Sequence, residues 1–352
     1  MVQAADYRER SSLLGRALTS RRLDSFLVTN PINVSYLSGF RGYDALILAT
    51  SKRKFFITDS RYIEEAKDTL RGFDVILVKG STYGTVKTLV SKARLKRIGF
   101  ESMNLPYEVA ARLKGLVRPS RFVPIKGLIE QFRAIKDEVE VRAIKDAIQL
   151  AKTVLDKIAG LIKPGITEKR LSEAAALEFI KRGAKTAFDT IVASGENSSK
   201  PHAIASDATI EKNSFTMIDI GCSLNGYNSD MTRMVVSGTV KDKFKKIYNI
   251  VRTAQETAIK KIRSGVMART VDMAARGYIR SRGFGKYFGH SLGHGVGMEA
   301  HEDPAVSSLS EGSLRSGMVI TVEPAIYIPK FGGARIEDMV LVTDTGCEIL
   351  TR

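Results

Sequence analysis

The spacing of hydrophobic and polar residues changes several times along the first third of the chain. Three segments have the apolar spacing of amphipathic helices, namely 5–18, 61–71 and 83–94. Five short apolar runs are typical of buried strands, namely 24–30, 44–50, 54–60, 73–80 and 97–102. Helices that alternate with buried strands predict an α/β domain, which we expect to cover residues 1–125.

The remaining chain has a longer pattern that occurs twice. A long amphipathic helix ends before Pro164-Gly165, a second covers 167–183, and strand-like runs fill 187–236. Two more helices follow, over 241–265 and 270–283, and then strands near 318–327 and 334–343. Two helices followed by a hairpin, twice over, indicate a duplicated domain over residues 126–352.

The first predicted hairpin, in "FTMIDIGCSLNGYNSDMTRMVV", contains two acids among apolar residues. Asn225-Gly226 is a strong signal for a two-residue turn, which would pair residues whose numbers sum to 451. Asp219 then faces Thr232, and Asp230 lies diagonally from Asp219 on the same face, with Cα atoms roughly 7–8 Å apart. Two buried carboxylates repel unless one protonates or a cation lies between them.

The second hairpin carries acids at corresponding places. Glu323 lies in "GMVITVEPAIYI", and Glu337 lies in "GGARIEDMVLVT" on the face that also carries Arg335. Glu323 follows Asp219 by 104 residues, and Glu337 follows Asp230 by 107. The acids therefore obey the same repeat as the helices and strands.

Histidines are concentrated in one glycine-rich stretch, "FGHSLGHGVGMEAHEDP". Three of the four histidines of the chain lie there, His290, His294 and His301. One imidazole with four carboxylates makes a site rich in oxygen, which favours Mn²⁺, Co²⁺, Fe²⁺ or Mg²⁺ over structural zinc. A pair of such cations can activate water and polarise a carbonyl group.

Composition and charge limit the compartment and the kinds of partner that we expect, but they do not identify a function. The formal net charge is +17, but its basic blocks (52–54, 92–97 and 241–246) are interleaved with acids. We therefore expect a solvated basic surface and no nucleic-acid partner. No apolar run is long enough for a membrane span, and Cys222 and Cys347 are too few for a disulfide framework. These features favour the cytoplasm.

These residues resemble a known family, the pita-bread metallopeptidases, in the branch of Xaa-Pro dipeptidases (prolidases) and Xaa-Pro aminopeptidases. "NVSYLSGFRGYDALILAT" and "FFITDSRYIEEA" resemble the creatinase-type N-terminal domain. Five later motifs resemble the catalytic domain in order: "FDTIVASGENSSKPHA", "DIGCSLNGYNSDMTR", "HSLGHGVGMEAHE", "TVEPAIYIP" and "GGARIED". The resemblance implies an α/β N-terminal domain and a pita-bread α+β catalytic domain of two pseudo-twofold helix–helix–hairpin units.

The resemblance also implies a set of ligands for two divalent cations, Mn²⁺ or Co²⁺ first and Fe²⁺ or Zn²⁺ as alternatives. Asp219 would bind the first cation, and Asp230 and Glu337 would bridge both. His294 and Glu323 would bind the second. A hydroxide would attack the carbonyl carbon of an Xaa-Pro bond, and Glu323 would carry the proton towards the proline nitrogen.

Five other residues match positions around the metals in the family. His301 matches the histidine that contacts substrate and stabilises the tetrahedral intermediate, and His202 and His290 match histidines of the substrate pocket. Thr232 and Arg335 match residues that orient the acidic ligands. Ala325 departs from the glycine common in the family, and alanine fits there if its φ is negative.

Several functions remain open within the resemblance. A dipeptidase and an aminopeptidase differ in loops and partner subunits, and both would act on small proline-containing peptides, commonly as homodimers. A methionine aminopeptidase would lack the α/β domain, and creatine hydrolysis does not use the five ligands. The alternative is a non-catalytic pita-bread protein that binds nucleic acid or a protein partner.

Overall fold

The chain divides into two compact units between Arg133 and Ala134. The computed structural model describes residues 7–42 and 44–352, so residues 5 and 6 of the first predicted helix lie outside the described part. Strand β6 (Arg121–Ile125) ends at the predicted boundary, and helix α6 (Leu128–Arg133) still belongs to the first unit. None of the described helices is both long and apolar enough to span a bilayer.

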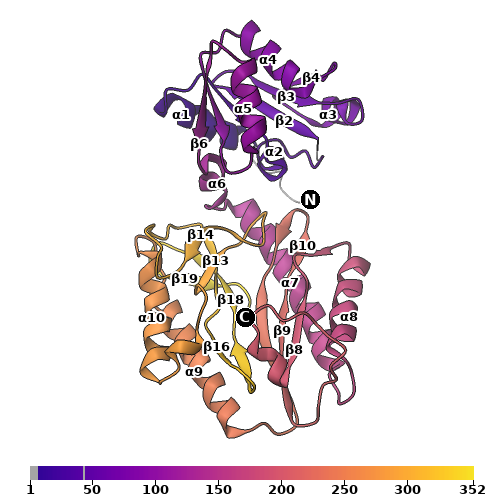
Figure 1. The fold of residues 1–352 in the computed structure, drawn as a ribbon, viewed down its shortest axis with the longest axis vertical. Helices are drawn as coiled ribbons and strands as arrows, with labels where there is room; N and C mark the ends of the chain where they lie inside the picture. The colour runs from indigo at the N-terminus through magenta and orange to yellow at the C-terminus, as the bar shows by residue number, and fades with distance from the viewer. Residues whose placement is uncertain (1–6, 43) are drawn as a thin grey trace. The chain divides into compact units, whose positions relative to one another are not determined.

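The first unit contains a six-stranded mixed sheet in the order β4-β3-β2-β1-β5-β6 (Figure 1). Strands β1–β2 and β2–β3 pair antiparallel, and the other neighbours pair parallel. Before β6, its elements are α1 (Tyr7–Ser20), β1 (Ser25–Val28), α2 (Pro31–Ser38), β2 (Ala45–Thr50), β3 (Lys54–Thr58), α3 (Ile63–Thr69), β4 (Asp74–Leu77), α4 (Thr82–Lys92), β5 (Arg97–Glu101) and α5 (Tyr107–Leu116).

The pattern of the sequence predicted α1, α3, α4 and strands β1 to β5, but it missed α2, α5, β6 and α6. Helix α2 is the clearest case because most of its residues are buried and its apolar residues have no helical period. Only its ends carry a signal: the Asn30 side chain accepts a hydrogen bond from the amide of Ile32, and Gly39 ends the helix with φ 79°.

The second unit repeats a helix pair followed by strands. The first half contains α7 (Glu138–Gly160), α8 (Glu168–Lys181), β7 (Lys185–Thr186), β8 (Ile191–Ser194), the 3₁₀ helix η1 (Gly195–Ser199), β9 (Ser214–Ile220), β10 (Cys222–Leu224), β11 (Tyr227–Asn228) and β12 (Met231–Ser237). The second half contains α9 (Asp242–Ile259), α10 (Ala268–Ser281), the 3₁₀ helix η2 (Gly285–Tyr287), β13 (Gly293–Gly295), β14 (Glu302–Val306), β15 (Val319–Val322), β16 (Ala325–Ile328), β17 (Gly332–Arg335), β18 (Asp338–Val342) and β19 (Cys347–Ile349).

Each half builds most of one buried core, and the junction between the two helices is the same in both halves. Helices α7 and α8 pack on the strands of the first half, and α9 and α10 on those of the second (Figure 1). At the junctions, Gly165 donates its amide hydrogen to Ile210 O, and Gly265 donates to Leu314 O. Both glycines have positive φ, so the left-handed turn is built twice.

The predicted register of the first hairpin is confirmed. Asp219 pairs with Thr232, and Leu224 pairs with Tyr227, so the partners sum to 451 as expected. Asn225 and Gly226 have φ values of 52° and 83°, as a type I′ turn requires. The register therefore places Asp219 opposite Thr232.

The strands around the acids are interrupted, which the sequence did not predict. We expected continuous strands near 318–327 and 334–343, but β15 ends before Glu323 and β17 ends at Arg335. Gln255 of α9, fully buried, donates hydrogen bonds to Val322 O and Ile336 O at these two breaks. The breaks leave Glu323 and Glu337 between the paired strands.

A charged cluster on the surface of the first half gives a pH-dependent prediction. Glu178 of α8 binds Lys157 of α7 at 2.8 Å and also binds Lys181 and Arg182, and these contacts lower its pKa to about 2. A carboxyl group with a lowered pKa stabilises the fold above its unfolded pKa of about 4.3, and this contribution is lost as the pH falls through about 2.

We therefore expect Glu178→Gln to lower the melting temperature at pH 7, with a difference from the unchanged protein that shrinks below about pH 4. Thermal unfolding followed by circular dichroism between pH 2 and 7 measures it. Glu311→Gln, at an exposed carboxylate, is the matched control. A constant difference across the range would show that the contacts of Glu178 do not depend on its charge.

Candidate metal centre

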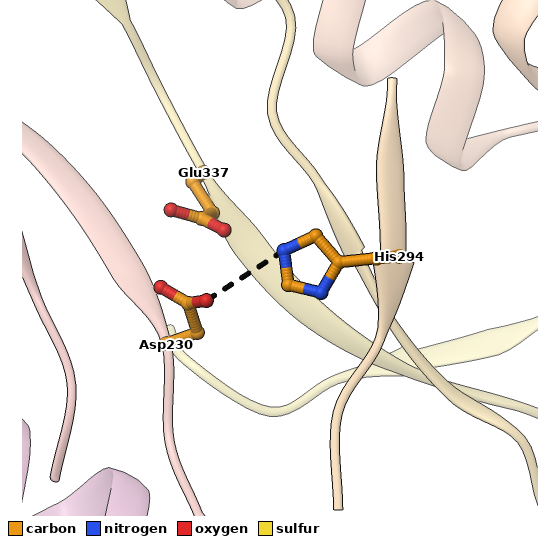
Figure 2. A group of neighbouring side chains, drawn as sticks. All are labelled: Asp230, His294 and Glu337. Carbon is orange, nitrogen blue, oxygen red and sulfur yellow. Dashed lines mark ion pairs between the residues drawn. The ribbon is translucent and has the colours of Figure 1, made fainter. Parts of the chain in front are cut away.

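Three expected ligands converge where the two halves meet. One ligand atom each of Asp230, His294 and Glu337 lies within 4.8 Å of the other two. Figure 2 shows the two carboxylates and the imidazole pointing at one another, with Asp230 Oδ2 3.7 Å from His294 Nε2. Asp230 precedes β12 of the first half, whereas His294 lies in β13 and Glu337 precedes β18 of the second. The cluster therefore exists only when both halves are folded together.

The imidazole of His294 is oriented for use of Nε2. Its Nδ1 lies 3.0 Å from Gly295 O, so Nδ1 carries the hydrogen and donates it to this carbonyl. The backbone amide of His294 donates to Thr321 Oγ1. In the neutral ring, Nε2 then presents its lone pair to the carboxylates, as metal-binding histidines do.

Glu323 adds a fourth polar side chain on the side of His294. Its Oε1 lies 3.3 Å from His294 Nε2 and accepts a hydrogen bond from Thr321 Oγ1 at 3.1 Å. Burial raises the pKa of Glu323, but the hydrogen bond and charge of His294, together with the charges of His290 and Arg335, outweigh burial and lower the pKa overall. Thr321 thus fixes both His294 and Glu323, and the site keeps an ionised carboxylate there.

Thr232 and Arg335 connect the acids of the two halves. Thr232 Oγ1 donates to Glu337 Oε2 at 2.7 Å and accepts from Arg335 Nε at 3.1 Å. Arg335 Nη2 donates to Asp219 Oδ2. The other oxygen of Asp219, Oδ1, is buried and has no hydrogen-bond partner among the described residues. A buried carboxylate oxygen without a donor is unfavourable unless a cation completes it.

The acids oppose one another in the absence of a cation. Burial raises the pKa of Asp230 well above its usual range, and the charge of Glu337 raises it further. Burial and the charge of Glu323 also raise the pKa of Glu337 well above its usual range. For Asp219, burial also raises the pKa, although Arg335 opposes the change. Among the described residues, Arg335 is the permanent cation that bonds to these acids, so the carboxylates need further cations to remain ionised together.

The cluster lies on the wall of a pocket of about 820 Å³ that is formed by the second unit alone. Nine of the ten expected site residues line it, all except Thr232: His202, Asp219, Asp230, His290, His294, His301, Glu323, Arg335 and Glu337. One face of helix α8 forms another wall, through Lys169, Ser172, Glu173 and Ala176. The volume is within the range of small-molecule sites, roughly 300–1,000 Å³.

The other three histidines surround the cluster at different depths. The ring of His301 stacks on His294 with centroids 3.8 Å apart, and its edge is exposed. His290 is half-buried; its Nδ1 donates to Ser291 O, which leaves Nε2 to face Tyr327 Oη at 3.3 Å. His202 lines the pocket from an exposed position. Ala325 lies in β16 without a positive φ, so alanine fits there as expected.

Tyr327 is a site residue that the sequence reasoning missed. Its hydroxyl accepts a hydrogen bond from Arg335 Nη1 and faces His290 Nε2, so it connects the charged cluster to the pocket histidine. The signal was present, because period-two alternation places Glu323, Ala325 and Tyr327 on one face. Arg335 also donates to Pro201 O at 3.0 Å, next to His202.

Two buried helix carboxylates hold the loops that carry the pocket histidines. Asp272 of α10 accepts hydrogen bonds from the Arg276 side chain and from the backbone amide of Leu292. Arg276, positioned in this way, also donates a hydrogen bond to His290 O. Glu168 of α8 holds the loop of His202 in the same manner. No local sequence signal marks the loop contacts of either carboxylate, because the loop residues that donate to them lie 20 to 38 residues away in the chain.

Glu168 accepts every hydrogen bond that it makes in this loop. Its Oε1 accepts from the amide of Ser194 at 2.6 Å and from Ser194 Oγ. Its Oε2 accepts from Asn197 Nδ2 at 2.8 Å and from the amide and hydroxyl of Ser206. A glutamine at this position would point its own NH₂ group at donors of the loop, which cannot accept a hydrogen bond from it.

We expect Glu168→Gln to lower the free energy of unfolding by about 1–3 kcal/mol, because a buried donor loses its acceptor. Urea unfolding measures the change, and limited proteolysis shows whether residues 195–206 become accessible. Glu211→Gln, at an exposed carboxylate of the same unit, should change neither. If both variants unfold alike, the carboxylate of Glu168 does not hold the loop.

The donor set fits a pair of divalent cations. It offers four carboxylates and one imidazole with a free Nε2, in a buried position where the carboxylates repel one another. Asp219 Oδ1 has no hydrogen-bond partner within residues 7–42 and 44–352. Such oxygen-rich sets suit Mn²⁺, Co²⁺ and Fe²⁺.

Two family models and several known proteins are similar to this chain. The family model described as Metallopeptidase family M24 matches residues 142–344, and the model for the Creatinase/Prolidase N-terminal domain matches residues 10–135. An Xaa-Pro dipeptidase of Pyrococcus furiosus is 36% identical over 98% of both chains.

Solved structures are similar over nearly the whole chain. An Xaa-Pro dipeptidase from Bacillus anthracis matches with a TM-score of 0.95 and 38% identity, covering 99% of this chain and 98% of that one. An X-Pro aminopeptidase from Thermotoga maritima matches with a TM-score of 0.88 and 37% identity, covering 95% and 97%. These matches confirm the fold class expected from the sequence. The chain belongs to metallopeptidase family M24 and carries a creatinase/prolidase-type N-terminal domain.

Proposed function

We propose that this chain is a two-metal peptidase that hydrolyses the Xaa-Pro bond at the N-terminus of dipeptides or short peptides. The observation that carries the proposal is the buried convergence of Asp230, His294 and Glu337 at a pocket wall. The names of its full-length relatives, Xaa-Pro dipeptidase and X-Pro aminopeptidase, support the choice of substrate.

The five expected ligands would hold the two cations from both halves. Asp230 and Glu337 belong to different halves, and both would help to hold the pair. Asp219, whose Oδ1 lacks a partner, would bind the first, and His294 and Glu323, which contact each other, would bind the second. Mn²⁺ or Co²⁺ suits this set best, and Fe²⁺ or Zn²⁺ are alternatives.

Bound cations would supply a water molecule of lowered pKa and polarisation of the scissile carbonyl group. The side chains of the protein do the remaining work. Glu323, which stays ionised, accepts a proton from the water and delivers it to the proline nitrogen. His301 donates a hydrogen bond to the carbonyl oxygen as negative charge develops there. His290 and His202 hold the peptide in the pocket.

Thr232 and Arg335 act through the ligands. Thr232 holds one oxygen of Glu337, and Arg335 holds one oxygen of Asp219, so each carboxylate keeps its other oxygen for a cation. The same arginine fixes Tyr327, which faces His290. We further propose that the protein works in the cytoplasm as a homodimer, as its sequence led us to expect.

The decisive experiment compares Ala-Pro with Ala-Pro-Ala as substrates for chelator-stripped protein, with and without added Mn²⁺ or Co²⁺. Turnover of the dipeptide alone identifies a dipeptidase, and turnover of the tripeptide identifies an aminopeptidase. Ala-Ala is the control for the requirement for proline. Absence of metal-dependent hydrolysis of both proline peptides would overturn the proposed function.

A further inference from the structure

The positive charge of the protein is unevenly divided between its two units. Residues 1–133 contain 24 lysines and arginines and 12 aspartates and glutamates, a net charge of +12. Residues 134–352 contain 31 and 26, a net charge of +5. The unit that carries none of the expected metal ligands therefore accounts for most of the +17.

Within the first unit, the charge is concentrated at one edge of the sheet. Residues 87–126, which run from α4 to β6, contain ten lysines and arginines but only Glu101 and Glu108 as acids. Glu101 is buried and bonded to Asn33, so it does not neutralise the surface. Strands β5 and β6 form this edge of the sheet, with α5 between them in sequence.

A surface groove of about 880 Å³ lies at this edge and is lined by four cations, Arg97, Lys114, Arg118 and Arg121, and by no carboxylate. Neither these guanidinium groups nor the ammonium group forms an ion pair with any carboxylate in the described part of the chain. Arg97 is half-buried and donates its Nε hydrogen to Arg22 O, which fixes it at the groove. We call this the basic groove.

The chemistry of the basic groove favours one kind of occupant. Three of its four cations are arginines, whose planar groups bind phosphate with two parallel hydrogen bonds. Phe122 is buried and stacked on Phe100 at 4.1 Å, so it offers no exposed ring for a base. Pro124 in edge strand β6 lacks an amide hydrogen, which disfavours the addition of a peptide strand.

We propose, against our expectation from the linear sequence, that the basic groove binds the phosphate backbone of nucleic acid without reading its sequence. The groove shares no residue with the peptidase pocket, because all of its lining residues belong to the first unit. Up to four phosphates would be neutralised, so the logarithm of the binding constant for duplex DNA should fall with the logarithm of salt concentration with a slope of about −3 to −4.

The test uses the whole protein and a short fluorescent DNA duplex, with binding measured by anisotropy over a range of salt concentrations. The double variant Arg118→Glu and Arg121→Glu should weaken binding on the order of tenfold or more and reduce the slope by about 2. The double variant Lys163→Glu and Lys212→Glu makes the same change of charge at exposed residues of the second unit and should bind nearly as the unchanged protein does. A second duplex of different sequence should bind equally well.

Three results would overturn the proposal: equal weakening in both double variants, an unchanged slope in the groove variant, or equally tight binding of poly-glutamate. Peptidase activity on an Xaa-Pro peptide should be the same in both variants, which also shows that they fold. Failure of DNA binding leaves the proposed peptidase function untouched, and failure of peptide hydrolysis leaves the basic groove untouched.

Discussion

Replacement of Glu337 by glutamine should lower kcat/KM for an Xaa-Pro dipeptide by about 10³-fold or more, the order expected when a group central to transition-state stabilisation is removed. Glu337 of the second half would hold the proposed cations together with Asp230 of the first half. It accepts a hydrogen bond from Thr232, and its charge raises the pKa of Asp230. Glutamine keeps the size of the side chain and can still accept from Thr232, but it lacks the negative charge.

The same variant should be at least as stable as the unchanged protein when metal is removed. Burial and repulsion raise the pKa of Glu337, and a carboxyl group whose pKa is raised by folding destabilises the fold at neutral pH, where the unfolded chain ionises it. Glu337→Gln removes this destabilising charge. Loss of activity together with retained or raised stability in chelator would separate a ligand role from unfolding.

The measurements are steady-state hydrolysis of Ala-Pro, metal content by mass spectrometry, and melting temperature in chelator. Asp344→Asn, at an exposed carboxylate close in sequence, is the matched control and should change none of them. We expect Glu337→Gln to bind less metal. Full metal content and full activity in Glu337→Gln would remove this residue from the ligand set.

The second large effect is expected for Arg335→Met. Arg335 is buried and donates to Asp219, Thr232 and Tyr327. Burial acts against its charge, but Asp219 and the other acids hold its pKa well above its usual range, so it is always charged. Removal of one partner from a buried charge pair typically costs about 3–5 kcal/mol.

We expect the metal-free Arg335→Met protein to lose stability of this order in urea unfolding at neutral pH, where the carboxylate of Asp219 is left without its partner. With metal present, kcat/KM should fall by about 10–100-fold, as is usual for residues that orient ligands. Arg335→Lys should recover stability in part, since it keeps the charge but not the planar set of donors. Arg269→Met, at an exposed arginine, should change stability by less than about 0.5 kcal/mol. Unchanged stability in Arg335→Met would show that the cluster does not need its charge.

The local sequence pattern was sufficient to predict much of the secondary structure of this protein. The two-residue turn at Asn225-Gly226 set the register that places Asp219 opposite Thr232, and the structure has that register. The sequence also predicted the helix pairs and their repeat, in which corresponding acids lie 104 and 107 residues apart. Such prediction was possible because hydrophobic periodicity and turn residues determine secondary structure over a few neighbouring positions. Helix α2 and strand β6 escaped prediction because their apolar residues follow no clear period.

The sequence by itself determined which residue types lie on which face of each hairpin, and a resemblance suggested their use. Only the tertiary structure decided that Asp230 of one half meets His294 and Glu337 of the other, that Gln255 binds the breaks in two strands, and that basic residues from β5, α5 and β6 form a groove. The physical reason is distance along the chain. Turns and amphipathic periods depend on neighbours within a few positions, whereas these contacts join residues many positions apart, and only the packing of whole elements brings such residues together.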